Sequence, residues 1–149
     1  MARGAKTDSI AVCLDSDVVI AGLLSRSGAS HAVLMLGEIG LLRIVVPAAA
    51  IDEVRRNLQS KLPEVLPLFE VFLASRFVET YRPRAADTKR ARTFAHDKDV
   101  PIMAAALGAR AALLVTHNTR HFRSSDGLRV IRPRALIDEA RAWMARFGR

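Results

Sequence analysis

The sequence has only one cysteine, and this scarcity sets the first limit on the protein. Cys13 lies in an apolar, strand-like run, and a single thiol cannot form a disulfide within one chain. Long hydrophobic runs are also missing, since no segment approaches the ~18 consecutive apolar residues of a membrane span. The segment from Met1 to Ser9 lacks the apolar stretch and cleavage site of a secretory signal. We therefore expect a soluble, cytoplasmic protein that does not act at a membrane.

The sequence also lacks the short motifs of several large functional classes. It contains no Gly-x-Gly-x-x-Gly, no P-loop, no Cys/His spacing suited to a metal and no serine-centred elbow. These absences exclude the classes that depend on those motifs. What the chain does contain is an apolar fraction of 50% in 149 residues, enough for a core without disulfides or structural metals. We expect a single domain spanning residues 1–149.

Basic residues outnumber acidic ones, and the formal net charge is +8. A cationic surface attracts phosphate backbones and releases their condensed counterions, so this charge favours a polyanionic partner. An arginine-rich solvated surface without such a partner is the alternative, because arginine is much commoner than lysine throughout the chain. The basic residues form two clusters, Arg82, Arg84, Lys89, Arg90, Arg92 and Lys98 in the first and Arg120, Arg123, Arg129, Arg132 and Arg134 in the second.

Short apolar runs alternate with stretches of helical periodicity along the chain. This pattern predicts an α/β fold in which helices cover both faces of a parallel sheet. The predicted strands are Ile10–Leu14, Leu42–Val46, Phe77–Thr80, Ala112–Thr116 and Leu128–Ile131. The predicted helices are Val18–Leu24, Ala29–Glu38, Ala48–Gln59, Glu64–Ala74, Val100–Arg110 and Ala135–Phe147.

Two of the predicted helices have apolar surfaces with more than one interpretation. In the last helix Leu136, Ala140, Trp143 and Phe147 recur at helical spacing, and we expect this helix to pack on the sheet. A membrane-surface helix is the alternative, but two acidic residues interrupt its basic face. The stretch 65–73 is unusually apolar. Core packing is the default expectation there, and a homodimer surface is the alternative.

Polar side chains follow two of the predicted strands. Asp15 comes directly after the first strand, and Asn118 comes after the fourth. In open parallel sheets ligands collect beyond the carboxyl ends of the strands, so these positions are the strongest candidates for binding a ligand. Asp17 forms an Asp-x-Asp pair with Asp15. We expect Asp15 to bind a metal and Asp17 to cap the helix that begins near Val18, and the alternative is that both are only caps.

Asp99 heads the apolar stripe of its predicted helix, because apolar residues follow it at offsets of three, four and seven. A carboxylate directed toward a core needs a partner, since desolvating it alone costs several kcal/mol. A metal ion would supply that partner. The alternative is an N-cap that accepts hydrogen bonds from first-turn amides. Asp97, two residues earlier, is a reserve ligand.

The third predicted helix carries Asp52 and Glu53 on opposite flanks of its apolar stripe, and helix geometry does not decide whether either is more than a solvated acid. Magnesium prefers hard carboxylate oxygens and usually takes one or two protein carboxylates plus substrate phosphate oxygens. A metal-dependent phosphodiesterase is therefore favoured by the set Asp15, Glu53, Asp99 and Asn118. The histidines carry less weight: His117 and His121 bracket Asn118, but isolated surface histidines are common, and His31 and His96 belong to no constellation.

At these positions the chain resembles the PIN-domain family, the metal-dependent ribonucleases that include the VapC-like toxins of bacterial toxin–antitoxin pairs. Four motifs in the order of that family carry the resemblance over nearly the whole chain. They are residues 14–20 (LDSDVVI), 52–58 (DEVRRNL), 97–107 (DKDVPIMAAAL) and 115–122 (VTHNTRHF). A small-residue loop at 26–30 (RSGAS) is similar to the one that often follows the first motif.

The resemblance implies a three-layer α/β/α fold with a central parallel sheet, and cleavage of RNA phosphodiester bonds with Mg²⁺ or Mn²⁺ held by Asp15, Glu53 and Asp99. Asp17 stands where the family usually has asparagine and adds a charge for the metal. Asn118 stands where a fourth carboxylate is often found, which leaves the number of metals open at one or two. We expect Asp17 and Asn118 to orient metal-bound waters. The residues expected to hold the RNA backbone are Arg84, Lys89, Arg90, Arg92, Arg120 and Arg123. If the chain is a toxin, its partner is an antitoxin protein.

Two other functions remain as alternatives. The Asp15-x-Asp17-x-Val19 sequence after a strand also resembles the nucleophile motif of haloacid-dehalogenase-type phosphatases. The order of motifs argues against that family, because its later acidic pair should follow Thr116, whereas Asp97 and Asp99 precede it. A catalytically degenerate RNA-binding module is the second alternative, and an assay with and without chelator would separate the three.

Overall fold

The computed structural model describes residues 9–125 and 127–148. Within these residues five strands form one parallel sheet in the order β3-β2-β1-β4-β5. The strands are β1 (Ile10–Leu14), β2 (Leu42–Pro47), β3 (Val78–Tyr81), β4 (Leu113–Val115) and β5 (Arg129–Ile131). The helices are α1 (Ser16–Leu24), α2 (Ala29–Glu38), α3 (Ala48–Lys61), α4 (Leu66–Leu73), α5 (Ala85–Ala91), α6 (Val100–Gly108) and α7 (Pro133–Ala145). Single 3₁₀ turns occur at η1 (Pro63–Val65), η2 (Asp97–Asp99) and η3 (Thr119–His121).

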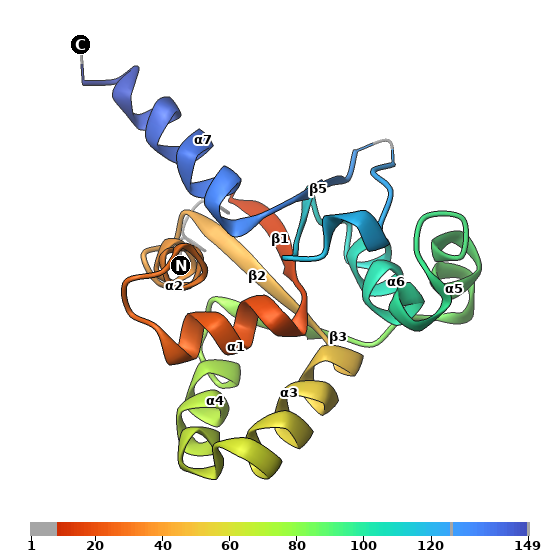
Figure 1. Cartoon of the computed structure of the whole chain (residues 1–149). Helices are drawn as coiled ribbons and strands as arrows, with labels where there is room; N and C mark the ends of the chain where they lie inside the picture. Colours follow the sequence, from red (N-terminus) through yellow and green to blue (C-terminus); the bar gives the residue numbers. More distant parts are fainter. Residues whose placement is uncertain (1–8, 126, 149) are drawn as a thin grey trace, which may run out of the picture.

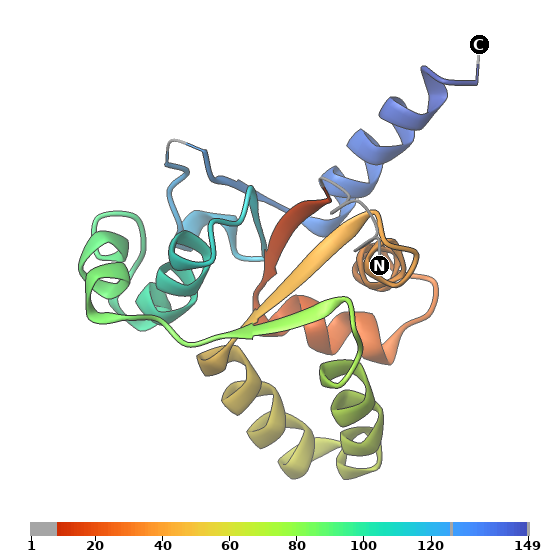
Figure 2. The same cartoon turned by 180° about the vertical axis from the view of Figure 1, so that it is seen from behind.

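Helices cover both faces of this sheet, so the predicted three-layer α/β/α fold is confirmed. The chain runs from β1 to β2 to β3 in one direction and then returns to the other side of β1 for β4 and β5. Because parallel crossovers are right-handed, this reversal places α1 to α4 on one face and α5 and α6 on the other. Figures 1 and 2 show these two groups on either side of the strands.

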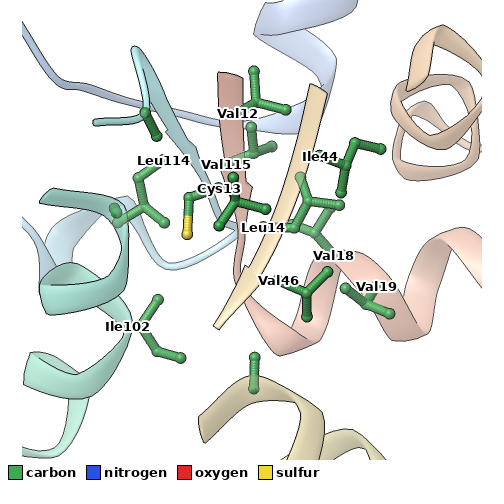
Figure 3. Packing of buried hydrophobic residues seen from close by; sticks show 14 of the residues in the cluster. Val12, Cys13, Leu14, Val18, Val19, Ile44, Val46, Ile102, Leu114 and Val115 are labelled. Carbon is green, nitrogen blue, oxygen red and sulfur yellow. The ribbon is translucent and has the colours of Figure 1, made fainter. Parts of the chain in front are cut away.

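The core lies between the sheet and these two helical layers. β1 is buried along almost its whole length, as expected for a central parallel strand covered on both faces. Figure 3 shows Cys13 and Leu114 on the side of the sheet that faces α6, where Ile102 lies, and Val18 and Val19 on the side of α1. Burial also raises the pKa of the Cys13 thiol, so this cysteine is an inert core residue.

The reversal of strand order positions the site. β1 and β4 are neighbours with the register Leu14↔Val115, so both strands end at the same edge of the sheet. Connections leave these two carboxyl ends in opposite directions, and this divergence opens a crevice where ligands bind in open α/β sheets. Asp15 and Thr116 are the first residues beyond the two strand ends.

The last helix departs from its prediction. Its first turns are anchored by the buried Leu136 and Ile137, and α7 packs against α2. Its second half projects from the domain (Figure 1), and Trp143 and Phe147 are 58% and 73% exposed. The expected packing of the whole helix on the sheet was therefore wrong. The helix is longer than the surface available to cover it, so only its amino-terminal turns are buried.

Helix α5 was not predicted, because in sequence its residues stood out only as part of a basic cluster. Seven residues with one buried apolar side chain, Ala91, give no apolar periodicity to detect. The other elements match their predictions to within one to three residues at their ends, with one change. The predicted helix Glu64–Ala74 is η1 followed by α4, and Pro67 lies in the first turn of α4.

No described helix is by itself long and apolar enough to cross a membrane. The helices α1 and α2 pass the same test of length and composition only as a pair, bent by 92°. The segment considered above for a secretory signal lies outside the described residues except for Ser9.

Candidate active site

An acidic hollow of about 320 Å³ opens at the carboxyl edge of the sheet. Four carboxylates enter it from three separate parts of the chain: α1 and its cap, α3, and the start of α6. We call this cavity the acidic hollow, and its lining residues are Asp15, Ser16, Asp17, Glu53, Lys98, Asp99, Asn118 and His121. The predicted metal-binding residues are therefore brought together, and the reserve ligand Asp97 is exposed outside the lining.

Asp15 is the most tightly held of these acids and is only 7% exposed. It is the N-cap of α1, and its Oδ1 accepts a hydrogen bond from the backbone N–H of Ser16 at 2.8 Å. Its Oδ2 accepts one from the Thr116 hydroxyl at 2.8 Å. Because Thr116 follows β4 and Asp15 follows β1, this bond fixes the carboxylate where the two strands diverge.

Asp17 does not cap α1, which corrects the prediction made for it. The helix begins two residues earlier than expected, so Asp17 lies in its first turn, and its side chain points to the loop after β4. Its Oδ2 accepts hydrogen bonds from the His117 backbone N–H and from Nδ2 of Asn118, each at 3.3 Å. Its Oδ1 is buried and has no hydrogen-bond partner among the described residues. One carboxylate oxygen thus remains available to a ligand.

Glu53, and not Asp52, lies on the side of α3 that faces the hollow. Its negative charge raises the pKa values of both Asp15 and Asp17, which reflects its proximity to them. Asp52 is exposed on the other flank, where its charge acts on Arg55. The packing of α3 against the sheet edge thus determines which of the two adjacent acids faces the hollow, a question that helical periodicity left open.

Asp99 precedes α6 and its side chain makes no capping hydrogen bond, so the interpretation of Asp99 as a simple cap is not supported. The side chain is 18% exposed, and its Oδ2 is buried. His121 Nδ1 lies 3.1 Å from this oxygen, but the direction of approach does not suit a hydrogen bond. The contact is therefore only electrostatic, and it depends on protonation of the imidazole. The Asp99 carboxylate lacks the partner that its burial requires.

The electrostatics of the hollow oppose a full set of negative charges. Burial, followed by repulsion from Asp17, raises the pKa of Asp15 to about 6. Burial also raises the pKa of Asp17, although the neighbouring His117 lowers it. Like charges that share a desolvated site raise one another's pKa in this way, and a cation between them relieves the repulsion.

The donor set fits a hard divalent cation. Four carboxylates and one amide are oxygen ligands of the kind that Mg²⁺ and Mn²⁺ prefer. Two of the carboxylates, Asp17 and Asp99, each have a buried oxygen without a hydrogen-bond partner among the described residues. Among the described residues, no three Asp, Glu, His or Cys side chains lie close enough together to hold a metal ion by themselves. Binding would therefore use few direct carboxylates and several waters, as is usual for magnesium.

The predicted RNA-binding residues do not gather around this hollow. Arg84 and Arg90 line a separate cavity, and the exposed Lys89, Arg92, Arg120 and Arg123 belong to the lining of neither. In the second basic cluster Arg129 pairs with Glu139 and Arg134 with Asp138, which reduces its free positive charge. The basic residue that does line the acidic hollow is Lys98.

Sequence reasoning missed three residues that shape the hollow. Thr116 had been considered only as the end of a strand, Lys98 only as a member of a basic cluster, and His121 only as a surface histidine. The position of Thr116 at the carboxyl end of a predicted strand was the available signal, because ligands collect at that edge of a parallel sheet. His121 comes close to Asp99 through a bridge between Ala95 and Phe122, which no local pattern reveals.

Fold and site together define a class of protein. Its members are α/β/α domains with an acidic site, suited to a cation, at the point where the strand order of the sheet reverses. Comparison with protein families agrees with this class. A family model described as PIN domain matches residues 11–120. The chain therefore belongs to the PIN-domain family of nucleases, and the resemblance seen in its four motifs is confirmed. A comparison with curated proteins found no significant match.

Two solved structures have the same fold at low sequence identity. One is VapBC2 from Rickettsia felis bound to a DNA fragment from their promoter, with a TM-score of 0.62 and 16% identity. The match covers 83% of this chain and 98% of the chain in that structure. The other is FitAB bound to the IR36 DNA fragment, with a TM-score of 0.56 and 20% identity over 82% of this chain and 94% of that one.

Proposed function

We propose that this protein is a metal-dependent endoribonuclease that hydrolyses RNA phosphodiester bonds with Mg²⁺ or Mn²⁺. The observation that carries the proposal is the pair of buried carboxylate oxygens, Asp17 Oδ1 and Asp99 Oδ2, which lack hydrogen-bond partners inside the acidic hollow. Burying such oxygens is costly unless a cation compensates them. The net charge of +8 supports a polyanionic substrate for the same domain.

Asp15, Glu53 and Asp99 would hold the cation, with Asp17 as a further ligand. A bound divalent cation supplies Lewis acidity toward the phosphoryl oxygen and lowers the pKa of a bound water. Thr116 and the backbone of Ser16 keep the Asp15 carboxylate in one orientation.

The remaining residues of the hollow position the substrate. Lys98 would bind a non-bridging phosphate oxygen as a point charge at the rim. Asn118 donates to Asp17 through Nδ2 and keeps its carbonyl oxygen for a water or a ligand. In this arrangement Asp17 and Asn118 act as one unit that orients water.

We further propose that the protein is the toxin of a bacterial toxin–antitoxin pair and acts in the cytoplasm. The motifs of the chain are similar to those of VapC-like toxins, and two structures with the same fold are VapBC2 and FitAB. An antitoxin partner would cover the acidic hollow and block RNA. Expression of the protein alone should then arrest growth, and co-expression with a protein encoded beside it should relieve the arrest and yield a complex on purification. Arrest that persists in Asp15→Asn would exclude nuclease chemistry as its cause.

The nuclease proposal is tested with purified protein, labelled RNA, and a cycle of chelation and metal return. We expect cleavage with Mg²⁺ or Mn²⁺, none with chelator, and recovery when metal is restored. Binding without cleavage under every metal condition would instead indicate a degenerate RNA-binding module. Hydrolysis of a small phosphomonoester without RNA cleavage would indicate the phosphatase alternative, which membership of the PIN-domain family already disfavours.

A further inference from the structure

A second cavity lies at the opposite end of α6 from the acidic hollow. It has a volume of about 360 Å³, and three arginines from two elements line it. We call this cavity the arginine hollow, and its lining residues are Arg84, Asp87, Arg90, Leu107, Gly108, Arg110, Ala111, Gly127 and Leu128. We propose that it binds a phosphate group of the same RNA strand whose scissile bond lies in the acidic hollow. This inference rests on the proposed ribonuclease function and adds a second point of contact with its substrate.

The backbone at Arg110 is the first observation behind this proposal. Arg110 has φ = 56°, and it is the only non-glycine residue with positive φ in the described part of the chain. It follows the C-cap of α6, where Ala111 N–H bonds to Ala106 C=O at 3.0 Å and Arg110 N–H to Leu107 C=O at 3.1 Å. This is a Schellman motif, in which glycine is the usual residue because a side chain costs about 1 kcal/mol.

An arginine in a glycine position calls for an explanation outside the helix. Glycine would adopt this left-handed conformation at lower cost, so the choice of arginine here points to a use for the guanidinium. Arg110 lines the cavity together with Arg84 and Arg90. Guanidinium groups present a planar fork of donors that matches phosphate oxygens, and three of them around one cavity form an anion site.

The one acid in the lining is already occupied. Asp87 Oδ2 accepts hydrogen bonds from the Tyr81 hydroxyl and the Arg84 backbone N–H, both at 2.9 Å, and Arg84 Nε lies 3.8 Å away. The charges of Arg84 and Arg90 both lower the pKa of Asp87, so its single negative charge is shared between these two arginines. Within residues 9–125 and 127–148, the ion pairs formed by arginines include neither Arg90 nor Arg110. The described lining thus carries an excess of two positive charges, which favours an anionic ligand.

The two hollows are connected by a basic helix. α5 begins at the arginine hollow, where Arg84, Asp87 and Arg90 share the cavity with the last turn of α6. Lys89 on α5 and Arg92 at its C-cap are both exposed. From there the chain continues toward the start of α6. Arg123 lies beside this end of the helix, since its backbone N–H bonds to Phe94 C=O. Figure 2 shows α5 and α6 side by side at one flank of the sheet.

The distance between the hollows suits a nucleic-acid strand. Asp99 and Gly108 are nine residues apart on α6, which corresponds to about 13 Å at 1.5 Å per residue. A single phosphate bound at one hollow cannot reach the other, whereas a strand of several nucleotides can follow the basic face of α5 between them.

The test uses Arg110→Gly in an Asp99→Asn background, so that RNA binds without being cut. If the arginine serves only the helix end, glycine should raise the melting temperature and leave RNA affinity unchanged. We expect instead that the melting temperature stays equal or rises while affinity for a longer single-stranded RNA falls about tenfold, as for the loss of one charge-assisted contact. The slope of log K against log salt should also fall in magnitude by about 0.7, the value for one phosphate contact on a single strand.

A short RNA and a surface control locate the effect. Binding of a dinucleotide, whose single phosphate cannot occupy both hollows, should be unchanged by Arg110→Gly, and Arg90→Gln should repeat the loss for the longer RNA. Arg141→Gln, an exposed arginine on α7, should have no effect on either RNA. Equal affinities of Arg110→Gly and its parent for the longer RNA would overturn the inference.

Two further results distinguish the alternatives. If the longer RNA and the dinucleotide lose affinity equally, and inorganic phosphate competes to the same extent with both, the cavity binds free phosphate and not a strand that spans two sites, which also overturns the inference. Wild-type protein that neither binds nor cuts RNA would refute the proposed function itself. Cleavage that is intact in wild type and unaffected by Arg110→Gly would refute only the second site.

Discussion

Thr116 joins the two strands that support the acidic hollow. Its hydroxyl donates to Asp15 Oδ2 at 2.8 Å and accepts from the Asn118 backbone N–H at 3.0 Å, and the side chain is fully buried. Thr116→Val keeps the shape but leaves both groups without this partner. We expect a loss of roughly 1–3 kcal/mol in the free energy of unfolding, measured by denaturant titration, together with slower cleavage.

Thr80→Val is the matched control, because Thr80 is exposed on β3 at the edge of the sheet. It should change stability by less than about 0.5 kcal/mol. If Thr116→Val is as mild as this control, then the hydroxyl does not hold Asp15, and the carboxylate is oriented by the helix cap alone.

A second prediction at this scale concerns Asp99, whose buried oxygen lacks a hydrogen-bond partner. Asp99→Asn keeps the shape and removes the charge, so we expect metal-dependent RNA cleavage to be abolished. The melting temperature of the metal-free protein should stay equal or rise, because an unpaired buried charge is removed. Asp97→Asn, two residues away and exposed, should cleave at the wild-type rate. Wild-type cleavage by Asp99→Asn would show that Asp99 has no part in the chemistry.

The adjacent acids of α3 provide a third comparison. Glu53 lines the acidic hollow and Asp52 does not, so Glu53→Gln should reduce cleavage strongly while Asp52→Asn should leave it unchanged. RNA cleavage rates at saturating Mg²⁺ measure both variants. Loss of activity confined to the Asp52 variant would mean that the opposite flank of α3 faces the substrate.

At the scale of elements, the close packing of α5 on α6 depends on Gly108. A Cβ at this position would clash with the carboxylate of Asp87 and the hydroxyl of Tyr81, which are hydrogen-bonded to each other. Gly108→Ala should therefore destabilise the domain by roughly 1–3 kcal/mol through overpacking, even though alanine has the higher helix propensity. Thermal unfolding measures the effect.

Gly28→Ala is the control for that substitution. Gly28 precedes α2 with ordinary negative φ, and a Cβ there meets only the Ser25 side chain at van der Waals distance. It should cost well under 1 kcal/mol. If the two variants are equally stable, then α5 can move away from α6 without loss, and the Asp87–Tyr81 pair is not a structural constraint.

At the scale of the whole molecule, the charge of the acidic hollow links stability to pH and metal. The pKa of Asp15 is raised from 3.8 to about 6, so the folded protein binds this proton more tightly than the unfolded chain does. The resulting stabilisation is fully present below pH 3.8 and is lost as pH rises through about 6. Between pH 5 and 7 the free energy of unfolding of the metal-free wild-type protein should fall by roughly 1 kcal/mol more than that of Asp15→Asn.

Added Mg²⁺ should reverse this loss, because a cation that binds only the folded state raises the melting temperature. The effect should be larger at pH 7 than at pH 5, where protonated Asp15 competes with the metal. Melting curves of both proteins at several pH values decide the matter. A melting temperature of wild type that does not respond to Mg²⁺ at pH 7 would contradict the assignment of a cation site.

Apolar surfaces also belong to this scale. Trp143, on the projecting part of α7, and Phe147, just beyond the end of that helix, contact each other with ring centroids 4.8 Å apart, yet both are exposed. In α4, Phe69 and Phe72 are buried, while Leu68 and Val71 are 50% and 67% exposed. Val65, Leu66 and Leu73 also pack against the core, so core packing accounts for most of that apolar stretch and leaves Leu68 and Val71 exposed. The homodimer surface stays a prediction, and sedimentation of the purified protein tests it.

The sequence by itself determined the class of fold. Alternating apolar runs and helical periodicity are local properties, and buried parallel strands such as Val12 to Leu14 produce continuous apolar runs that can be read directly. The same reasoning located Asp15 and Asn118, because residues just after strands collect at one edge of a parallel sheet. It failed for α5, whose single buried apolar residue leaves no periodicity, and for the far half of α7, whose apolar stripe has no surface to cover.

Tertiary structure alone decided how the site is assembled. Periodicity places Asp52 and Glu53 symmetrically, and only the position of α3 against the sheet edge turns Glu53 inward. Thr116 and His121 reach the acids through contacts between residues that are far apart in the chain or joined by a bridge, and no local rule contains such distances. The residues expected to hold the RNA backbone are likewise separated from the acids, because Arg84 and Arg90 line a cavity at the other end of α6 from Asp99.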